Sequence, residues 1–178
     1  MLEVEAKLRP AAPRIEALRA RLEALAGAPR LRQQSDTYFH HPSRDLKARD
    51  EALRLRCDDG LAITWKGPKL DPPLKTREEI EFGLDTDLAT ATRLLEALGF
   101  SPVATVEKER EEWTLATPTD ASICIDRVLG LGTFVEVEVQ ADDAGKGRVQ
   151  VESLLAELDL ADCEPVATSY LGLLLAAL

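Results

Sequence analysis

The chain has 178 residues, of which 45% are hydrophobic and 30% are charged. Its length is close to the roughly 100–150 residues of a typical domain, so we expect a single domain over residues 1–178. No apolar run approaches the roughly 18 residues that cross a bilayer, which argues against a helical membrane protein. The N-terminus is acidic where a signal peptide needs a basic region, so we expect a soluble, cytoplasmic protein with no membrane partner.

The charge balance and the cysteines exclude further classes. Lys and Arg number 22 against 32 Asp and Glu, for a formal net charge of −10. This balance argues against a protein that binds nucleic acid over its whole surface, although it leaves room for a local basic pocket. Cys57, Cys124 and Cys163 are widely spaced and contain no CxxC pair. We therefore expect reduced core or strand residues rather than a disulfide framework or a zinc site.

The N-terminal elements have clear periodicities. Residues 2–8 alternate apolar and charged, which is typical of a strand and places Glu3, Glu5 and Lys7 on one face. Apolar residues at helical spacing then predict an amphipathic helix over residues 14–26.

The rest of the chain continues in the same style. Asp59-Gly60 separates two short apolar-alternating segments and predicts a β-hairpin turn. The proline-rich stretch 67–73 predicts a loop that could act as a mobile flap. Asp87 or Thr86 is placed to cap a helix. The further strands are expected at 34–40, 52–58, 61–66, 76–83, 103–115, 121–128 and 133–140, and the further helices at 88–98, 149–158 and 168–178.

This order of elements predicts the fold class. About eight strands come mostly as consecutive hairpins, with about four helices between or after them. Such an order favours an antiparallel α+β protein over a doubly wound parallel sheet.

The charged faces of the strands are the most informative feature. A single alternating strand usually turns its charged face to solvent. Here the pattern recurs along the chain, and the charges are grouped by sign. If the apolar faces pack outward against the helices, the charged faces point together, either across an open sheet or into the lumen of a closed barrel, and eight strands suffice for closure around a small ligand. The same-face sets are Glu3/Glu5/Lys7, Arg54/Arg56, Arg77/Glu79/Glu81, Lys108/Arg110 and Glu136/Glu138, with Lys66 and Asp126 alone on their strands.

These residue types indicate a chemistry. Carboxylate oxygens are hard ligands suited to Mg²⁺ or Mn²⁺, whereas Arg and Lys bind phosphate oxygens. Both together predict a metal–polyphosphate site. The common phosphate loops are missing, because there is no GxxxxGK[ST] and Gly130-Leu131-Gly132 fits a turn better than a dinucleotide loop.

The ordered motifs resemble the CYTH superfamily, also called triphosphate tunnel metalloenzymes. Glu3-Val4-Glu5-Ala6-Lys7 looks like its ExExK signature, and the resemblance covers about 170 residues. The Asp-Thr-Tyr-Phe, Lys-Gly-Pro-Lys and Gly-Leu-Gly-Thr-Phe elements look most like the branch that includes class IV adenylyl cyclases. The other matching segments are Asp36-Thr37-Tyr38-Phe39, Leu53-Arg54-Leu55-Arg56, Trp65-Lys66-Gly67-Pro68-Lys69, Arg77-Glu78-Glu79-Ile80-Glu81, Glu107-Lys108-Glu109-Arg110, Asp126-Arg127-Val128, Phe134-Val135-Glu136-Val137-Glu138 and Ser169-Tyr170-Leu171.

The resemblance implies a closed eight-stranded antiparallel β-barrel with amphipathic helices packed outside and a triphosphate in its lumen. It implies three sets of site residues, with Glu136, Glu138 and Lys108 as the catalytic ones. The phosphate-binding set is Lys7, Arg54, Arg56, Lys66, Arg77, Lys108 and Arg110; the Mg²⁺- or Mn²⁺-binding set is Glu3, Glu5, Glu136 and Glu138; and the supporting set is Glu79, Glu81 and Asp126.

The sequence leaves the reaction open. An adenylyl cyclase acting on ATP and a phosphohydrolase acting on inorganic tripolyphosphate, thiamine triphosphate or a nucleoside triphosphate would use the same charges. A non-catalytic polyphosphate-binding module would tolerate loss of the acids, yet all four motif acids are present. A nucleic-acid-binding barrel would need exposed stacking aromatics, and only 4% of residues are aromatic. Relatives in this branch suggest a homodimer.

Some single residues have two interpretations. Tyr38 could be a hydrogen-bond donor in the lumen or a core aromatic. Trp65 neighbours Lys66 and so faces away from it, which favours packing between barrel and helix. Glu111 and Glu112 are expected at the surface.

Overall fold

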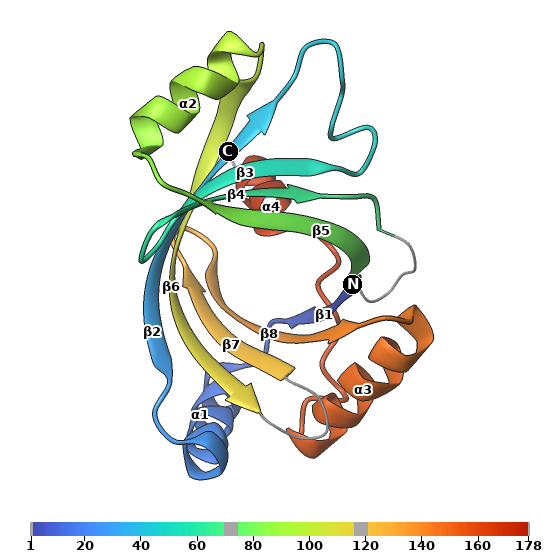
Figure 1. Ribbon diagram of the computed structural model, residues 1–178. Helices are drawn as coiled ribbons and strands as arrows, with labels where there is room; N and C mark the ends of the chain where they lie inside the picture. Colours follow the sequence, from blue (N-terminus) through green and yellow to red (C-terminus); the bar gives the residue numbers. More distant parts are fainter. Residues whose placement is uncertain (1, 70–74, 116–120, 178) are drawn as a thin grey trace.

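The computed structural model describes residues 2–69, 75–115 and 121–177, and it contains a closed antiparallel barrel of eight strands (Figure 1). Its strands are adjacent in the order β1-β5-β4-β3-β2-β6-β7-β8. This confirms the predicted fold class. The elements are β1 (Leu2–Leu8), α1 (Ala12–Ala26), β2 (Arg30–His40), β3 (Ala52–Cys57), β4 (Leu61–Lys66), β5 (Lys75–Leu84), α2 (Leu88–Ala97), β6 (Ser101–Leu115), β7 (Ala121–Val128), β8 (Gly132–Ala141), α3 (Ala144–Glu157) and α4 (Tyr170–Ala176).

The local signals in the sequence act as expected. β3 and β4 form the predicted hairpin, and the amide of Asp58 donates to the carbonyl of Gly60 across its turn at 2.9 Å. The side chain of Asp87 accepts from the amide of Thr90 and caps α2. The proline-rich stretch 67–73 falls largely outside the described residues.

Strand β1 closes the barrel, because it pairs with both β5 and β8. Its register sets Glu5 opposite Glu138 and Lys7 opposite Glu136. The first and last strands of the chain therefore place their acidic residues side by side on the inner face.

The outward apolar side chains are covered unevenly. Helix α3 packs on β1 and β8, α1 packs on β6, and their apolar residues join the largest core cluster. A β-carbon at Gly147 of α3 would lie 2.6 Å from Val4, so this helix approaches β1 too closely for a side chain. Figure 1 shows α1 and α3 at one end of the barrel and α2 at the other.

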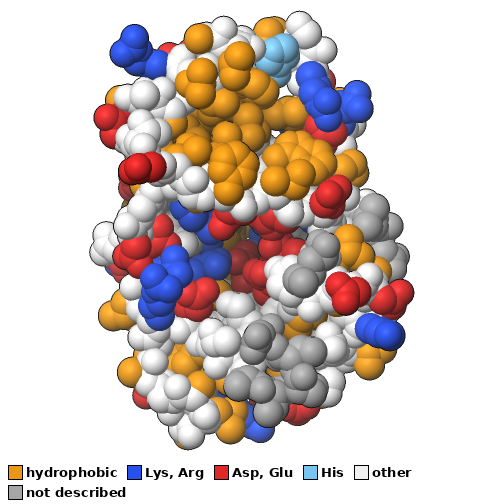
Figure 2. Space-filling view, viewed as in Figure 1, with side chains coloured by type: hydrophobic (Ala, Val, Ile, Leu, Met, Phe, Trp, Pro, Cys, Tyr) orange, Lys and Arg blue, Asp and Glu red, His pale blue; other side chains and the backbone are white. Residues whose placement is uncertain are grey.

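The outer face of β4 and β5 has less cover. Trp65 is half-buried and packs with the residues under α2, which confirms its predicted outward direction. Ile80 and Phe82 stay 50% and 57% exposed. Figure 2 shows apolar side chains gathered over the α2 end of the molecule.

Helix α4 is placed differently from the other three, because it lies against inward-facing residues. Tyr170 packs in a cluster with Val106, Val128 and Phe134. These three strand residues share the inward face with the lumen charges of their strands. One end of the barrel lumen is therefore apolar and is filled by α4. No helix in the described ranges is long and apolar enough to span a membrane.

Candidate functional site

A cavity of about 1260 Å³ occupies the barrel, and charged side chains from seven of the eight strands line it, together with Ser122 from β7. Figure 2 shows blue and red side chains around a hollow at the middle of the molecule. Every predicted site residue except Asp126 lines this one cavity: Glu3, Glu5, Lys7, Arg54, Arg56, Lys66, Arg77, Glu79, Glu81, Lys108, Arg110, Glu136 and Glu138.

Asp126 lies behind the cavity wall and is fully buried. It accepts from Lys108 Nζ at 2.9 Å and from Arg110 Nε and Nη2 at 2.7 and 2.6 Å. The hydroxyl of Tyr170 donates to the same carboxylate at 3.0 Å. Arg110 also donates to Glu136. Since one buried carboxylate holds both basic side chains, Lys108 and Arg110 form a fixed pair, named here the Asp126 pair.

A second basic pair has the same construction. Asp36 is 2% exposed and accepts from Arg56 Nε and Nη2, each at 2.7 Å, and from Arg54 Nη1 at 3.2 Å. Burial opposes ionisation of this carboxyl, but the two guanidinium groups outweigh it and hold the pKa of Asp36 well below its usual range. We name Arg54 and Arg56 the Asp36 pair.

The sequence analysis did not assign Asp36 a role in the site. A signal was present, because Asp36 has the same inward parity as Gln34 and Tyr38 on β2. What the sequence lacked was the register, which sets Asp36 directly opposite Arg56.

The opposite side of the cavity is rich in carboxylates. We name Glu3, Glu5, Glu79 and Glu138 the acidic group. Lys66 Nζ lies 3.1 Å from Glu3 and 2.8 Å from Glu79, and Arg54 Nη2 lies 3.7 Å from Glu79.

The pKa values of these acids follow from their burial and from the charges that lie beside each of them. Burial raises the pKa of Glu138 to about 8, and the carboxylates of Glu3 and Glu5 add to the shift. Burial and the neighbouring Glu3 raise the pKa of Glu79 to about 7. Burial acts on Glu3 in the same direction, but Lys66 outweighs it, and the pKa of Glu3 falls to about 2. At neutral pH, Glu3 is therefore ionised, whereas the raised pKa values of Glu79 and Glu138 keep protons on these two acids.

The donor chemistry of the acidic group fits a divalent cation. Hard carboxylate oxygens are the ligands that Mg²⁺ and Mn²⁺ prefer, and a bound cation would relieve the repulsion that raises these pKa values. Within residues 2–69, 75–115 and 121–177, no three His, Cys, Asp or Glu side chains already converge as a metal-holding group. Magnesium commonly takes only one or two carboxylates plus water and substrate phosphates, so this arrangement is sufficient.

Two further predicted residues differ in their surroundings. Arg77 is buried at the cavity wall, and its Nε has no hydrogen-bond partner in the described structure. A buried donor in this state is costly unless something accepts from it. Glu81 is half-exposed and accepts from the hydroxyl of Thr64 at 2.6 Å, so it belongs to the rim of the cavity.

The prediction that Glu112 is a surface residue is wrong. It lines the cavity and its carboxylate lies 3.0 Å from Arg32 Nε. Its position two residues after Arg110 gives it the inward parity of the Asp126 pair, and that signal was overlooked. Glu111 faces outward and pairs with Arg19 of α1. Tyr38 lines the cavity and packs on the α4 cluster, which agrees with its predicted role as a core aromatic, while its role as a hydrogen-bond donor in the lumen stays a prediction.

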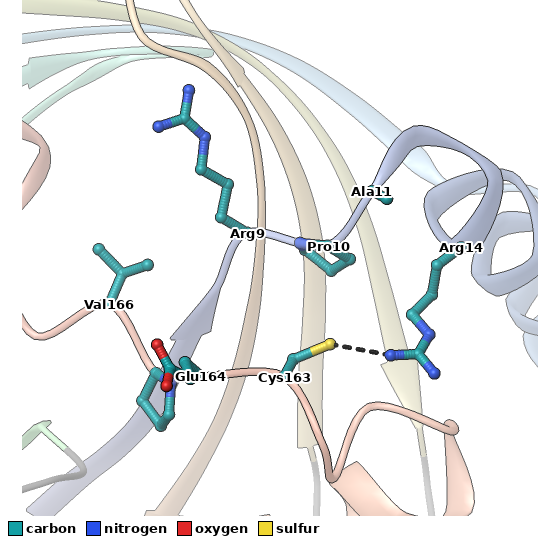
Figure 3. Close-up of a pocket in the computed structure, with 8 residues that line it drawn as sticks. Arg9, Pro10, Ala11, Arg14, Cys163, Glu164 and Val166 are labelled. Carbon is teal, nitrogen blue, oxygen red and sulfur yellow. Dashed lines mark hydrogen bonds between the residues drawn. The ribbon is translucent and has the colours of Figure 1, made fainter.

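A smaller pocket of about 480 Å³ lies outside the barrel, where the start of α1 meets the segment before α4 (Figure 3). Arg14 donates to the Cys163 sulfur at 3.3 Å and to Asp162 at 2.7 Å. Arg9 points away from Arg14 and donates to the Leu131 carbonyl at 2.7 Å. The Arg14 contacts thus fasten the segment before α4 to α1, and the Arg9 contact joins the end of β1 to the β7–β8 turn.

Known proteins match this chain over nearly its whole length. The family model of the CYTH domain matches residues 1–167. A protein of Methanocaldococcus jannaschii named "Putative adenylate cyclase MJ0240" is 38% identical over 144 residues, which are 79% of this chain and 80% of that protein. The PH1819 protein from Pyrococcus horikoshii OT3 has a TM-score of 0.86 at 34% identity and covers 98% of both chains.

A more distant structure shares the fold. HpAC1 from Hippeastrum, described as having a dominant triphosphatase activity, superposes with a TM-score of 0.73 at 18% identity, over 98% of this chain and 95% of that one.

Proposed function

This chain belongs to the CYTH domain family, and from that premise we propose that it is a divalent-metal-dependent enzyme that acts on a triphosphate. The leading reaction is cyclisation of ATP to cyclic AMP and pyrophosphate, as the name of the Methanocaldococcus jannaschii relative suggests.

One observation carries this proposal. Two basic pairs, each held by its own buried aspartate, face the same cavity as a group of mutually repelling carboxylates. The basic pairs suit the phosphate oxygens of a polyanion, and the carboxylates suit the cation that accompanies it. The unsatisfied Nε of Arg77 adds a buried donor that a phosphate oxygen would satisfy.

In this proposal the basic residues bind the phosphates and the acidic residues bind the metal. Lys7, Lys66, Arg77, the Asp36 pair and the Asp126 pair bind phosphate oxygens and offset their charge. Glu3, Glu5, Glu136 and Glu138 hold the metal, with Glu79 and Glu81 in support, whereas Asp126 supports the site by holding Lys108 and Arg110. When bound, Mg²⁺ or Mn²⁺ polarises the attacked phosphorus and stabilises the leaving oxygens.

Lys108 has the most direct catalytic role among the cations. Burial and the neighbouring Arg110 lower its pKa, while Asp126 opposes that shift and fixes the ammonium in place. A cation held in a buried site stabilises charge that develops on a phosphate oxygen without reorganising. Glu136 and Glu138 complete the catalytic set on the metal side.

A phosphohydrolase is the second candidate, since the same charges would serve attack by water on the terminal phosphate. The description of HpAC1 as mainly a triphosphatase illustrates that a protein of this fold can favour that reaction. The cavity itself has apolar residues from β2, the β2–β3 connection and α4, including Phe39, Leu46 and Leu175, which favours an organic triphosphate over inorganic tripolyphosphate.

A substrate panel tests the proposal. ATP, thiamine triphosphate and inorganic tripolyphosphate are each incubated with the purified protein and Mg²⁺ or Mn²⁺, with an EDTA control, and products are identified by chromatography. Cyclic AMP and pyrophosphate from ATP establish the cyclase. Orthophosphate without cyclic product establishes the phosphohydrolase, and tight binding without turnover leaves a binding module.

A further inference from the structure

Tyr170 occupies the boundary between the apolar end of the lumen and its charged part. Ser169 caps α4 by accepting from the amide of Gly172, so Tyr170 is the first residue of the helix. Its ring meets Phe134 edge to face, with centroids 5.1 Å apart and planes at 62°. Its hydroxyl points the other way and donates to Asp126. One side chain therefore connects the apolar filling of the barrel to the Asp126 pair.

Two ammonium groups lie over the same ring. Lys7 Nζ is 4.3 Å from the ring centroid of Tyr170, and Lys108 Nζ is 5.2 Å from it. Lys7 also donates to the backbone carbonyl of Thr168, just before the helix. Like charges repel in a buried site, and the negative face of an aromatic ring attracts both of them.

The hydroxyl has a defined direction. Burial, together with the carboxylates of Glu136 and Asp126, raises the pKa of Tyr170 above its usual value, so the phenol stays protonated. Asp126 can only accept from it, and the same aspartate accepts from Lys108. The ring is thus fixed relative to Lys108 by contacts at both of its ends.

We propose that Tyr170 is a positioning residue, which holds Lys7 and Lys108 as a pair around a single phosphate group of the substrate. The inference rests on the proposed function, because it assumes that these lysines bind phosphate. It assigns α4 a part in substrate binding and not only in filling the barrel.

Docking of α4 and positioning of the lysines can be separated. Leu174 is a half-buried residue of α4, and it packs against the apolar cluster that contains Tyr170. Tyr170→Leu removes both the ring and the hydroxyl. Tyr170→Phe removes the hydroxyl alone, and Leu174→Ala is the matched control that weakens packing of the helix.

The affinity for inorganic tripolyphosphate is measured by calorimetry in the presence of Mg²⁺, and KM and kcat are measured with the best substrate of the panel. We expect Tyr170→Leu to weaken binding about tenfold to a hundredfold, since two cation–π contacts of a desolvated site are lost. We expect the affinity to fall about threefold in Tyr170→Phe and less than about twofold in Leu174→Ala. The change should fall on KM more than on kcat, because ground-state phosphate contacts are lost.

A double-mutant cycle with Lys7→Ala shows whether Tyr170 acts on phosphate binding through Lys7. If it does, Tyr170→Leu costs severalfold less affinity in a Lys7→Ala background than in the wild type. Should Tyr170→Leu fail to fold, Tyr170→Met fills the same space with a flexible side chain that has no aromatic face and gives the same comparison.

Each other outcome overturns the proposal. Unchanged Kd and KM in Tyr170→Leu, whatever its kcat, would mean that Tyr170 does not position the lysines for phosphate binding. Equal losses in Tyr170→Leu and Leu174→Ala would mean that Tyr170 only stabilises the helix. A wild-type protein that binds no triphosphate would overturn the proposed function itself, and this inference with it.

Discussion

The carboxylates on the two sides of the cavity have different surroundings. In the Asp36 and Asp126 pairs, each carboxylate is outnumbered by cations and is fully paired inside the wall. In the acidic group, Lys66 pairs with Glu3 and Glu79, and burial beside neighbouring carboxylates raises the pKa values of Glu79 and Glu138. The comparison teaches that acids in one lumen have two different roles. The aspartates are part of the scaffold, whereas the proposed function assigns the glutamates to the metal ion.

The largest effect is expected from Asp126→Ala. Removing the fully buried carboxylate leaves Lys108 and Arg110 without its charge, and the loss of a buried ion-pair partner costs about 3–5 kcal/mol. Urea unfolding at pH 7 measures this change. The control is Asp162→Ala, whose exposed pair with Arg14 should contribute less than about 1 kcal/mol. An equally small loss for Asp126 would remove the distinction between the two sides.

A substitution in the acidic group should reduce activity without reducing stability, whereas Asp126→Ala should reduce stability. We expect Glu138→Gln to reduce turnover of any triphosphate by about a hundredfold or more, because a metal ligand is lost. The metal-free protein should keep its melting temperature or gain slightly, because repulsion from Glu3 and Glu5 is relieved. Glu109→Gln, an exposed acid on β6, is the control. Retained turnover in Glu138→Gln would take this residue out of the metal site.

Arg54 tests whether the basic pairs face the substrate. Arg54→Ala should weaken tripolyphosphate binding by about tenfold, which corresponds to one charged hydrogen bond. The control is Arg127→Ala, because Arg127 is an exposed arginine of the same barrel that pairs with Glu109. Calorimetry of both variants gives the comparison. Equal affinities for the two variants would place Arg54 away from the phosphates.

The last prediction concerns the pH dependence of stability. The folded-state pKa of Asp36 is depressed, so its contribution to stability is fully present above the unfolded value of about 3.9 and is lost as pH falls toward the folded value. The difference in unfolding free energy between wild type and Asp36→Asn should therefore be constant from about pH 7 to 5 and shrink below about pH 4. A difference that already shrinks between about pH 7 and 5 would contradict the depressed pKa.

Much of the barrel was predictable because strand periodicity is local. Alternation in the first eight residues was enough to place Glu3, Glu5 and Lys7 on one face, and the same reasoning placed both arginines of β3 on one face. Asp36 was missed because it is a lone acid in an otherwise uncharged stretch of β2. Its importance comes from a partner 20 positions away along the chain.

The sequence by itself determined which side chains share a face, because a strand has a period of two and a helix one of 3.6. It also determined where hairpins and caps form, through residues such as Gly60 and Asp87. Only the tertiary structure decided which faces meet: β1 lies between β5 and β8, and the Tyr170 ring lies against the ammonium groups of Lys7 and Lys108. The physical reason is that periodicity specifies the direction of a side chain, whereas its partners depend on strand order and register over long separations in the chain.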